Sequence, residues 1–466
     1  MTVPKALDAP HQSPRIFGHP YLAATMGILL VVTLVAFEGM SVGVVMPDIS
    51  KDLNALNLYG VSFSAFLIAS LFANVVAGLW ADRHGYVLPF LVGLVLFVLG
   101  MGLAGASQSA GMFLAARAVQ GLGAGPTIVA LYVMIARVYP PDVRPRVFAA
   151  LSAAWVVPAM VGPGVAGFVG QTWGWRWVFY GIIPLVVPAL VMLVPALKRR
   201  DTDEETAAPR GPRSRPLAMT VAASATAAGG GVLLYGVDRL HAAPLPSLVA
   251  CAAGLAALLY GLFKLLPPGS LRFGRGLPTT VMMRGLFSAS FFGVNAFIPL
   301  ALQEVKSFET VPAGIALTTG ALGWSAASYL QSRRAAEPHV RVRTGAACVT
   351  VGIVLSVLAV LPGVSGWVAV PAWVVAGFGM GLGMTTVSIT TLKLSPVNEQ
   401  GANSASLSVT DMLGSALTLG IGGALVNLIG HSPTEIAWGF GVICGLMGAI
   451  ALATTLLSSR VAPASS

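Results

Sequence analysis

The sequence predicts an all-α integral membrane protein whose chain crosses a bilayer about fourteen times. Three observations carry this prediction. The 466 residues are 56% hydrophobic and only 9% charged, whereas soluble globular chains carry roughly 25% charged residues. The mean hydropathy is +0.82. Finally, apolar runs of about 20 residues, the length that spans a bilayer, follow one another along almost the whole chain.

Proline, glycine and charge clusters separate these runs. The first run follows a polar N-terminal stretch and has no A-x-A cleavage pattern after it, so we expect a retained helix and no cleaved signal. The expected spanning helices lie near residues 21–48, 59–82, 88–107, 110–137, 146–170, 176–197, 217–239, 244–266, 278–303, 310–331, 343–362, 367–393, 401–429 and 434–458.

The charges predict how the chain is oriented in the membrane. With the N-terminus placed inside, roughly 21 Lys and Arg residues fall on the inner side and about 4 on the outer side, as the positive-inside rule requires. Both termini are therefore expected to be cytoplasmic. The formal net charge of +10 forms no continuous basic face, so we expect no nucleic-acid partner.

An internal repeat divides the chain into halves. The stretch "GLGAG" at residues 121–125 aligns with "GFGMG" at residues 377–381, and the same shift pairs Gly167 with Gly423. Six helices in each half leave two between them. The predicted organisation is a tail at 1–20, a six-helix bundle at 21–197, a cytoplasmic linker at 198–216, an inserted helix pair at 217–266, a second six-helix bundle at 278–458 and a tail at 459–466.

Cysteine and histidine patterns argue against metal and enzyme chemistry. The three cysteines lie in apolar runs without the spacing of a metal site. The six histidines lie in loops, tails or helix ends, and an intramembrane enzyme would need them clustered with other catalytic groups. We therefore expect no metal, no cofactor and no enzymatic activity.

The loop "GLWADRHGYVLPF" at residues 78–90 resembles the loop signature of the major facilitator superfamily. Gly78, Asp82, Arg83 and Gly85 match, whereas Tyr86 stands where a basic residue is usual. The resemblance implies the major facilitator fold, and a gating loop whose aspartate holds the inner side shut against the helix that begins near residue 401. The alternative is a solvated turn with one charge pair.

The stretch "RAVQGLGAGP" at residues 117–126 is similar to the superfamily motif R-x-x-Q-G-x-G. A nucleotide-binding loop is excluded because no strand precedes these glycines. Arg117 lies about two turns inside its helix and must find a carboxylate, a carbonyl or water. The resemblance implies a role in proton coupling; the alternative is an arginine that reaches the outer interface.

The stretch "PAMVGPGVAGFVG" at residues 158–170 resembles the antiporter motif of exporters, with Pro158, Gly162, Pro163 and Gly167 in motif positions. Closely spaced Gly and Pro let membrane helices approach and kink. The stretch "GWRWVFYGIIP" that follows at residues 174–184 resembles an element of the fourteen-helix drug:proton antiporter branch. The resemblance to the antiporter motif implies outward transport.

Glu38 is a single carboxylate in the apolar stretch "TLVAFEGMSVGVVMP", roughly 15 Å from the outer end of its helix. Its spacing to Pro47 resembles that of an acidic residue in the same branch, although Met40 and Gly43 depart from the pattern. Burial raises the proton affinity of a carboxylate, so we interpret Glu38 as a proton carrier. The alternative is a permanently neutral, structural carboxyl.

Asp411 is the comparable acid of the second half, and its role stays open between a proton site and a counter-charge for a cation. We expect Arg284 to extend its side chain to the membrane interface. Six residues are candidates for lining a substrate cavity, although aromatic residues in membrane helices are more often packing. They are Phe37, Trp155, Phe291, Phe292, Asn295 and Trp373.

Together these features predict a proton-coupled secondary exporter, of the multidrug-efflux and antibiotic-resistance type, that moves lipophilic and cationic small molecules by alternating access. Its energy source is the proton gradient. The alternative is a dedicated exporter of one endogenous antibiotic, lipid or metabolite. The expected partners are a small-molecule substrate, protons and membrane lipids; we expect a monomer in the cytoplasmic membrane of a bacterium.

Overall fold

The computed structural model describes residues 16–462 except positions 55, 199–215, 334–336 and 397–398. The described residues hold no β strand. The first half contains α1 Leu22–Asp52, α2 Tyr59–His84, α3 Val87–Gly105, α4 Ala110–Val138, α5 Arg144–Trp173, α6 Arg176–Tyr180 and α7 Ile183–Lys198, followed by α8 Pro216–Asp238 and α9 Pro244–Leu265. The second half contains α10 Leu277–Asn295, α11 Ile298–Lys306, α12 Thr310–Arg333, α13 Pro338–Leu358, α14 Ala369–Leu394, α15 Gln400–Ile429 and α16 Pro433–Leu457.

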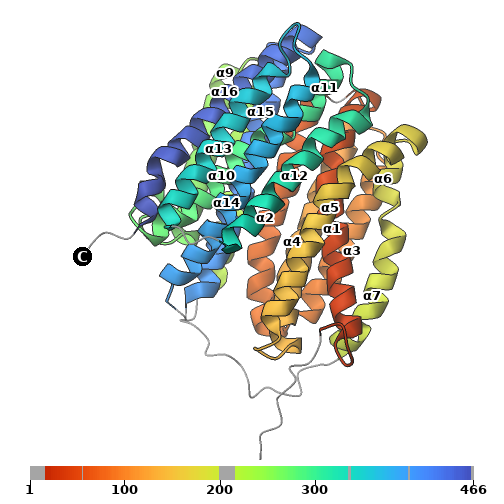
Figure 1. Ribbon diagram of the computed structural model, residues 1–466, viewed down its shortest axis with the longest axis vertical. Coiled ribbons are helices and arrows are strands. Elements are labelled where there is room, and N and C mark those ends of the chain that lie inside the picture. Colours follow the sequence, from red (N-terminus) through yellow and green to blue (C-terminus); the bar gives the residue numbers. More distant parts are fainter. Residues whose placement is uncertain (1–15, 55, 199–215, 334–336, 397–398, 463–466) are drawn as a thin grey trace, which may run out of the picture.

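Within the described residues, the helices cross the bundle fourteen times. Thirteen of them are long and apolar enough to span a membrane, with α6 and α7 forming one crossing and α10 and α11 another. The fourteenth is α12, which is less apolar but has 24 residues and is therefore about 36 Å long. It joins α11 at one end of the bundle to α13 at the other (Figure 1). The predicted all-α membrane fold is thus confirmed.

The two ends of the bundle differ in charge. We call the end at which α2 meets α3, at Gly85, the basic end, because basic residues lie in the last turns of five helices there. These residues are Arg83, Arg137, Lys198, Lys264 and Lys393. We call the other end, where the halves pack together, the closed end. The predicted linker at 198–216 lies almost entirely outside the described residues.

Matching glycines pack α4 and α14 in the same way. A Cβ atom on Gly121 would clash with the Phe66 carbonyl of α2, and one on Gly377 would clash with the Gly320 carbonyl of α12. Only glycine allows backbones to approach this closely. The repeat read from the sequence therefore corresponds to a repeated helix contact.

The closed end is made by two related interfaces between the halves. Gly167 of α5 packs on the start of α12 at Val311, and Gly423 of α15 packs on the start of α2 at Gly60. The Tyr59 hydroxyl donates a hydrogen bond to the carbonyl of Ala296 at 2.7 Å. Polar and close-packed contacts thus hold the halves together at this end.

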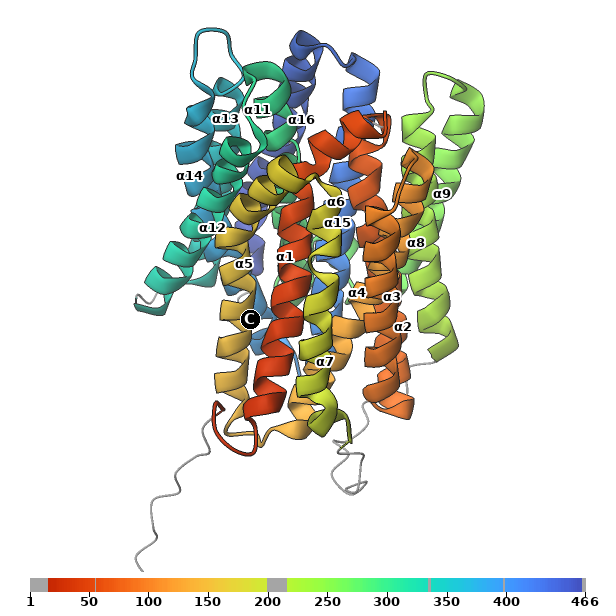
Figure 2. The same ribbon diagram turned by 90° about the vertical axis from the view of Figure 1, so that its right-hand side faces the viewer.

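The helix pair α8 and α9 lies at the edge of the bundle (Figure 2). A Cβ atom on Gly229 would lie 2.5 Å from the backbone nitrogen of Leu258, so the two helices are in close backbone contact. On its inner side α8 packs against α2 and α15. The pair therefore touches one helix from each half.

Candidate functional site

A cavity of about 4800 Å³ lies between the two halves. Its wall is formed by α1, α2, α4 and α5 of the first half and by α10, α12, α14 and α15 of the second. It extends from Arg83 and Gly401 at the basic end to Arg117 and Asn295 in the middle of the bundle. Because the halves are packed together at the closed end, the cavity is accessible from the basic end.

Glu38 and Arg117 form an ion pair beside the deepest part of this cavity. Arg117 Nη1 of α4 donates to Glu38 Oε1 of α1, and also to Gln120 Oε1 at 2.6 Å. The two charged side chains are only 1% and 3% exposed. The Phe66 ring lies under the guanidinium, 4.5 Å from its centre. Arg117 therefore finds a carboxylate inside the bundle, and its role in proton coupling stays a prediction.

This buried pair is poorly satisfied by hydrogen bonds. Glu38 Oε2, Arg117 Nε, Gln120 Nε2 and Ser41 Oγ are all buried, and none has a hydrogen-bond partner among the described residues. A buried polar atom without a partner costs about 1–3 kcal/mol. Bringing water to the pair would relieve part of this penalty. Arg117 itself lies on the cavity wall. A change in the charge of Glu38 therefore changes the electrostatic potential in the cavity.

Asp411 and Arg284 form a second pair, in the other half. Asp411 Oδ2 of α15 accepts from Arg284 Nε at 2.9 Å and from Arg284 Nη2 at 2.7 Å, and Ser288 donates to Asp411 Oδ1. Arg284 Nη1 donates to Ser388 at 3.1 Å. The prediction that Arg284 extends to the interface was wrong, because Asp411 lies within its reach on the neighbouring helix.

Four of the six candidate cavity residues line the cavity: Trp155, Phe291, Phe292 and Asn295. Phe37 and Trp373 are not among the lining residues. Trp373 is completely buried behind Phe291, with ring centroids 4.8 Å apart, and its indole N–H donates to Asn295. Phe37 faces α5, where its ring lies 3.5 Å from a Cβ built on Gly162. These two aromatic residues are packing, as aromatic residues in membrane helices often are.

The residues predicted to form the gating loop surround the mouth of the cavity. Gly78, Asp82, Arg83 and Gly85 line it from the first half, and Gly401 lines it from the second. In this conformation the cavity lies between the loop residues of the first half and Gly401 of the second. A closing contact between Asp82 and α15 stays a prediction for a conformation that is shut at the basic end.

The helix with the antiporter-like motif lies between the halves. Gly162 packs against Phe37 and Met40 of α1, and Gly167 packs against α12 of the other half. Pro163 lines the cavity, and Pro158 is buried one turn earlier. A helix with two prolines and small residues at this place can bend while it keeps contact with both halves.

Sequence reasoning missed four side chains that complete the two pairs. Gln120 lies one turn after Arg117, and Phe66 comes from a helix with no sequence link to it. Ser288 and Ser388 lie on α10 and α14 and meet Asp411 and Arg284 only in the folded chain. One helix turn of spacing could have identified Gln120; no sequence signal points to the other three.

Comparisons with known proteins agree with this architecture. A family model of the Major Facilitator Superfamily matches residues 28–419. The chain is 23% identical over 309 residues to "Multidrug efflux pump SdrM" of Staphylococcus aureus (strain N315), covering 65% of this chain and 67% of that protein. It is 26% identical over 405 residues to "Probable multidrug-efflux transporter Rv1634" of Mycobacterium tuberculosis (strain ATCC 25618 / H37Rv), covering 82% and 83%.

Among solved structures, the fold is similar to a crystal structure of the peptide transporter POT in complex with sulfate. The TM-score is 0.68 at 16% sequence identity, and the alignment covers 96% of each chain. At this identity the likeness concerns the fold alone. The family match covers most of the chain, and the helices and repeat agree with it. The chain is therefore a multi-pass membrane transporter that belongs to the Major Facilitator Superfamily.

Proposed function

We propose that the protein is a proton-coupled exporter of lipophilic small molecules that works by alternating access. The observation that carries this proposal is the buried, under-satisfied pair of Glu38 and Arg117 beside a cavity accessible from one end only. The names of the two bacterial relatives, both multidrug efflux proteins, support the direction of transport.

The proposed coupling follows from the chemistry of the pair. When the cavity opens at the closed end, water reaches Glu38 and a proton can bind its carboxylate. Neutral Glu38 releases Arg117, which then repacks or finds water. When the cavity opens again at the basic end, the proton leaves and the ion pair forms again. Each step changes the charge on the cavity wall, so the two conformations bind substrate with different affinity.

The orientation follows from the positive-inside rule, which places the basic end in the cytoplasm. Both termini then face the cytoplasm. In the conformation described here, the cavity would receive substrate from the cytoplasm or the inner leaflet. Transport outward requires the contacts at the closed end to break.

A cationic substrate has less support than a lipophilic one. That expectation rested on Glu38 and Asp411 together as counter-charges, and Arg117 and Arg284 already pair with them. Apolar side chains, by contrast, dominate the α5 wall, where Phe148, Trp155 and Val156 face the cavity. Apolar surface is thus the substrate property that this wall favours.

The test uses proteoliposomes with an imposed proton gradient. Accumulation of ethidium (cationic) and Nile red (neutral) is measured together with substrate-triggered proton movement, for the wild type, Glu38→Gln and Glu435→Gln. Glu435 caps α16 at the closed end and is exposed, so its variant controls for loss of a carboxylate. We expect Glu38→Gln to lose gradient-driven accumulation and Glu435→Gln to keep it. Accumulation by Glu38→Gln at the normal rate would refute the coupling role.

A further inference from the structure

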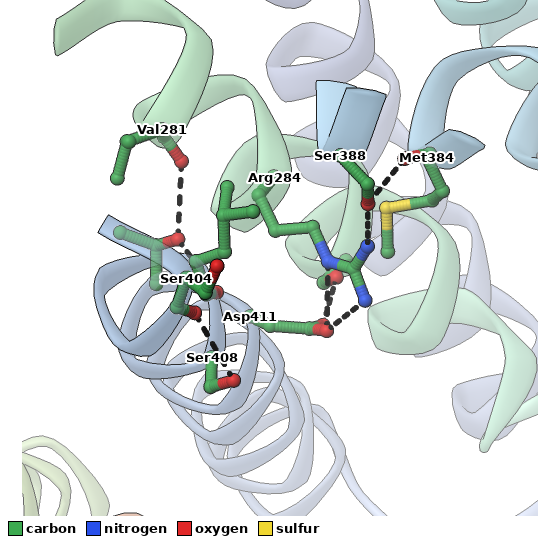
Figure 3. Close-up of polar contacts among 10 residues, drawn as sticks. Val281, Arg284, Met384, Ser388, Ser404, Ser408 and Asp411 are labelled. Atoms are coloured by element: carbon green, nitrogen blue, oxygen red, sulfur yellow. Dashed lines mark hydrogen bonds and ion pairs between the residues drawn. The ribbon is translucent and has the colours of Figure 1, made fainter. Parts of the chain in front are cut away.

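Arg284 and Asp411 form a charged site on the cavity wall that the proposed coupling does not use. Figure 3 shows the Arg284 guanidinium of α10 pointing at the Asp411 carboxylate of α15, with Ser388 of α14 on its other side. The two charged side chains are 25% and 24% exposed, whereas Arg117 and Glu38 are 3% and 1% exposed. A ligand in the cavity can therefore reach this second pair directly.

The hydrogen bonds of the pair leave room for a better acceptor. Nε and Nη2 of Arg284 both donate to the same oxygen, Asp411 Oδ2. The strongest arginine–carboxylate geometry instead uses two parallel bonds to two oxygens. The second oxygen of Asp411, Oδ1, accepts from Ser288 instead of from Arg284. A carboxylate that arrives from the cavity has no such constraint.

Polar residues form a row along the face of α15 that lines the cavity. Ser404, Ser408, Asp411 and Ser415 recur at helical spacing on α15, and all four line the cavity. The opposite wall is apolar and aromatic along α5. The cavity thus suits a molecule with an apolar body and a hydrogen-bonding head, with the head on the α15 side.

We propose that Arg284 binds an acidic group of the substrate. When the cavity is empty, Asp411 binds the Arg284 guanidinium in its place. The substrate class would then be lipophilic carboxylates, including zwitterions that carry one. This inference rests on the proposed function for its meaning in transport, but binding itself can be tested without transport.

Displacement of Asp411 changes the charge of the cavity wall. Once the ligand takes Arg284, Asp411 is a half-buried carboxylate without its cation. The described parts of the surrounding helices hold the following titratable and charged groups: Arg284 on α10; Arg117, Tyr132 and Arg137 on α4; Tyr59, Asp82, Arg83 and His84 on α2; Lys393 on α14; Tyr235 and Asp238 on α8; and Cys444 and Glu435 on α16. Apart from Arg284, Arg117, Tyr132 and Cys444, these groups lie at or near helix ends.

The experiment is calorimetric titration of the purified protein in detergent with three probes that share a naphthalene body. They are naphthylacetate, naphthylethylammonium and naphthylethanol. We expect naphthylacetate to bind at least about tenfold more tightly than the other two. Equal affinity for the three probes would overturn the proposal.

Variants distinguish the contribution of Arg284 to binding from that of Asp411. Asp411→Asn removes the carboxylate that competes for Arg284, and we expect it to bind naphthylacetate about tenfold more tightly than the wild type. Arg284→Gln should abolish the preference for the carboxylate probe. Because that change leaves Asp411 without its cation, the double variant Arg284→Gln/Asp411→Asn provides a neutral pair of similar shape and should show the same loss. Thr350→Ala, which removes a hydroxyl bonded within α13, is the control.

The outcomes are distinguishable from those of the coupling test. If the double variant still prefers naphthylacetate, Arg284 is not the anion site, whatever the transport assays show. If the wild type binds naphthylacetate as expected but proteoliposomes accumulate no substrate, the proposed export fails and the binding site stands.

Discussion

Gly60 of α2 lies directly against Gly423 of α15, and this contact helps to seal the closed end of the cavity. A Cβ atom built on Gly423 would be 2.8 Å from the Gly60 Cα, closer than real Cβ atoms approach other atoms. The related contact of α5 with α12 lies on the other side of the same seal. The conformation accessible from the basic end therefore depends on small residues at the opposite end.

Gly423→Ala should favour opening of the closed end. The added methyl group forces α2 and α15 apart, and such overpacking costs typically about 1–3 kcal/mol. Spin labels on the exposed ends of α2 and α15 at the closed end should report longer distances than in the wild type. Gly445→Ala is the control, because no atom lies within 4 Å of its Cβ position. Unchanged distances in Gly423→Ala would show that the contact does not hold this conformation.

Two polar contacts at the closed end should differ in strength. Thr310 donates to Asp48 at 2.9 Å, and Thr310 is only 6% exposed. Thr310→Val leaves the carboxylate short of one donor and should weaken the closed end by about 1–3 kcal/mol. Lys51 bonds Glu304 at 2.8 Å, but its side chain is 61% exposed, so Lys51→Met should change less than about 1 kcal/mol. The same spin-label distances measure both variants, and a larger shift in Lys51→Met would contradict this ranking.

Breaking one partner of the buried pair should destabilise the protein strongly. Glu38→Ala leaves the Arg117 charge buried without a carboxylate, which costs about 3–5 kcal/mol. The double variant Glu38→Gln/Arg117→Gln carries no buried charge and should recover much of that loss. Thermal unfolding in detergent measures both. A double variant no more stable than Glu38→Ala would mean that packing at these positions, rather than charge, sets the stability.

The repeated glycines should respond alike to substitution. Gly121→Ala and Gly377→Ala each place a methyl group against a carbonyl of the neighbouring helix, so both should lower the unfolding temperature in detergent by similar amounts. Gly164→Ala, where nothing lies within 4 Å, should be tolerated. If only one of the repeat variants is destabilised, the two contacts are not equivalent in energy.

Most of the fold could be predicted because the bilayer restricts the chain so severely. A spanning segment must be apolar, about 20 residues long and internally hydrogen-bonded. Each of these requirements depends only on the residues of the segment itself. The boundary of α13 shows the limit of this reasoning. It begins at Pro338 rather than near residue 343, because polar residues at a helix end face water and leave no hydropathy signal.

The site could be predicted only in part. Glu38, Arg117 and Asp411 stood out because a charge inside an apolar run is rare and must have a partner. The partner of Asp411 could not be identified from the sequence. Arg284 lies 127 residues before Asp411, and it was assigned to the interface on the basis of its own helix alone.

The sequence by itself determined the number of crossings, their order, the repeat and the presence of buried charges, since hydropathy, spacing and charge act on each segment separately. Tertiary structure alone decided which charges neutralise each other, which aromatic residues reach the cavity and which end is open. Those properties depend on distances between helices far apart in the chain, and a few ångströms separate a counter-charge available to substrate from one already bound by arginine.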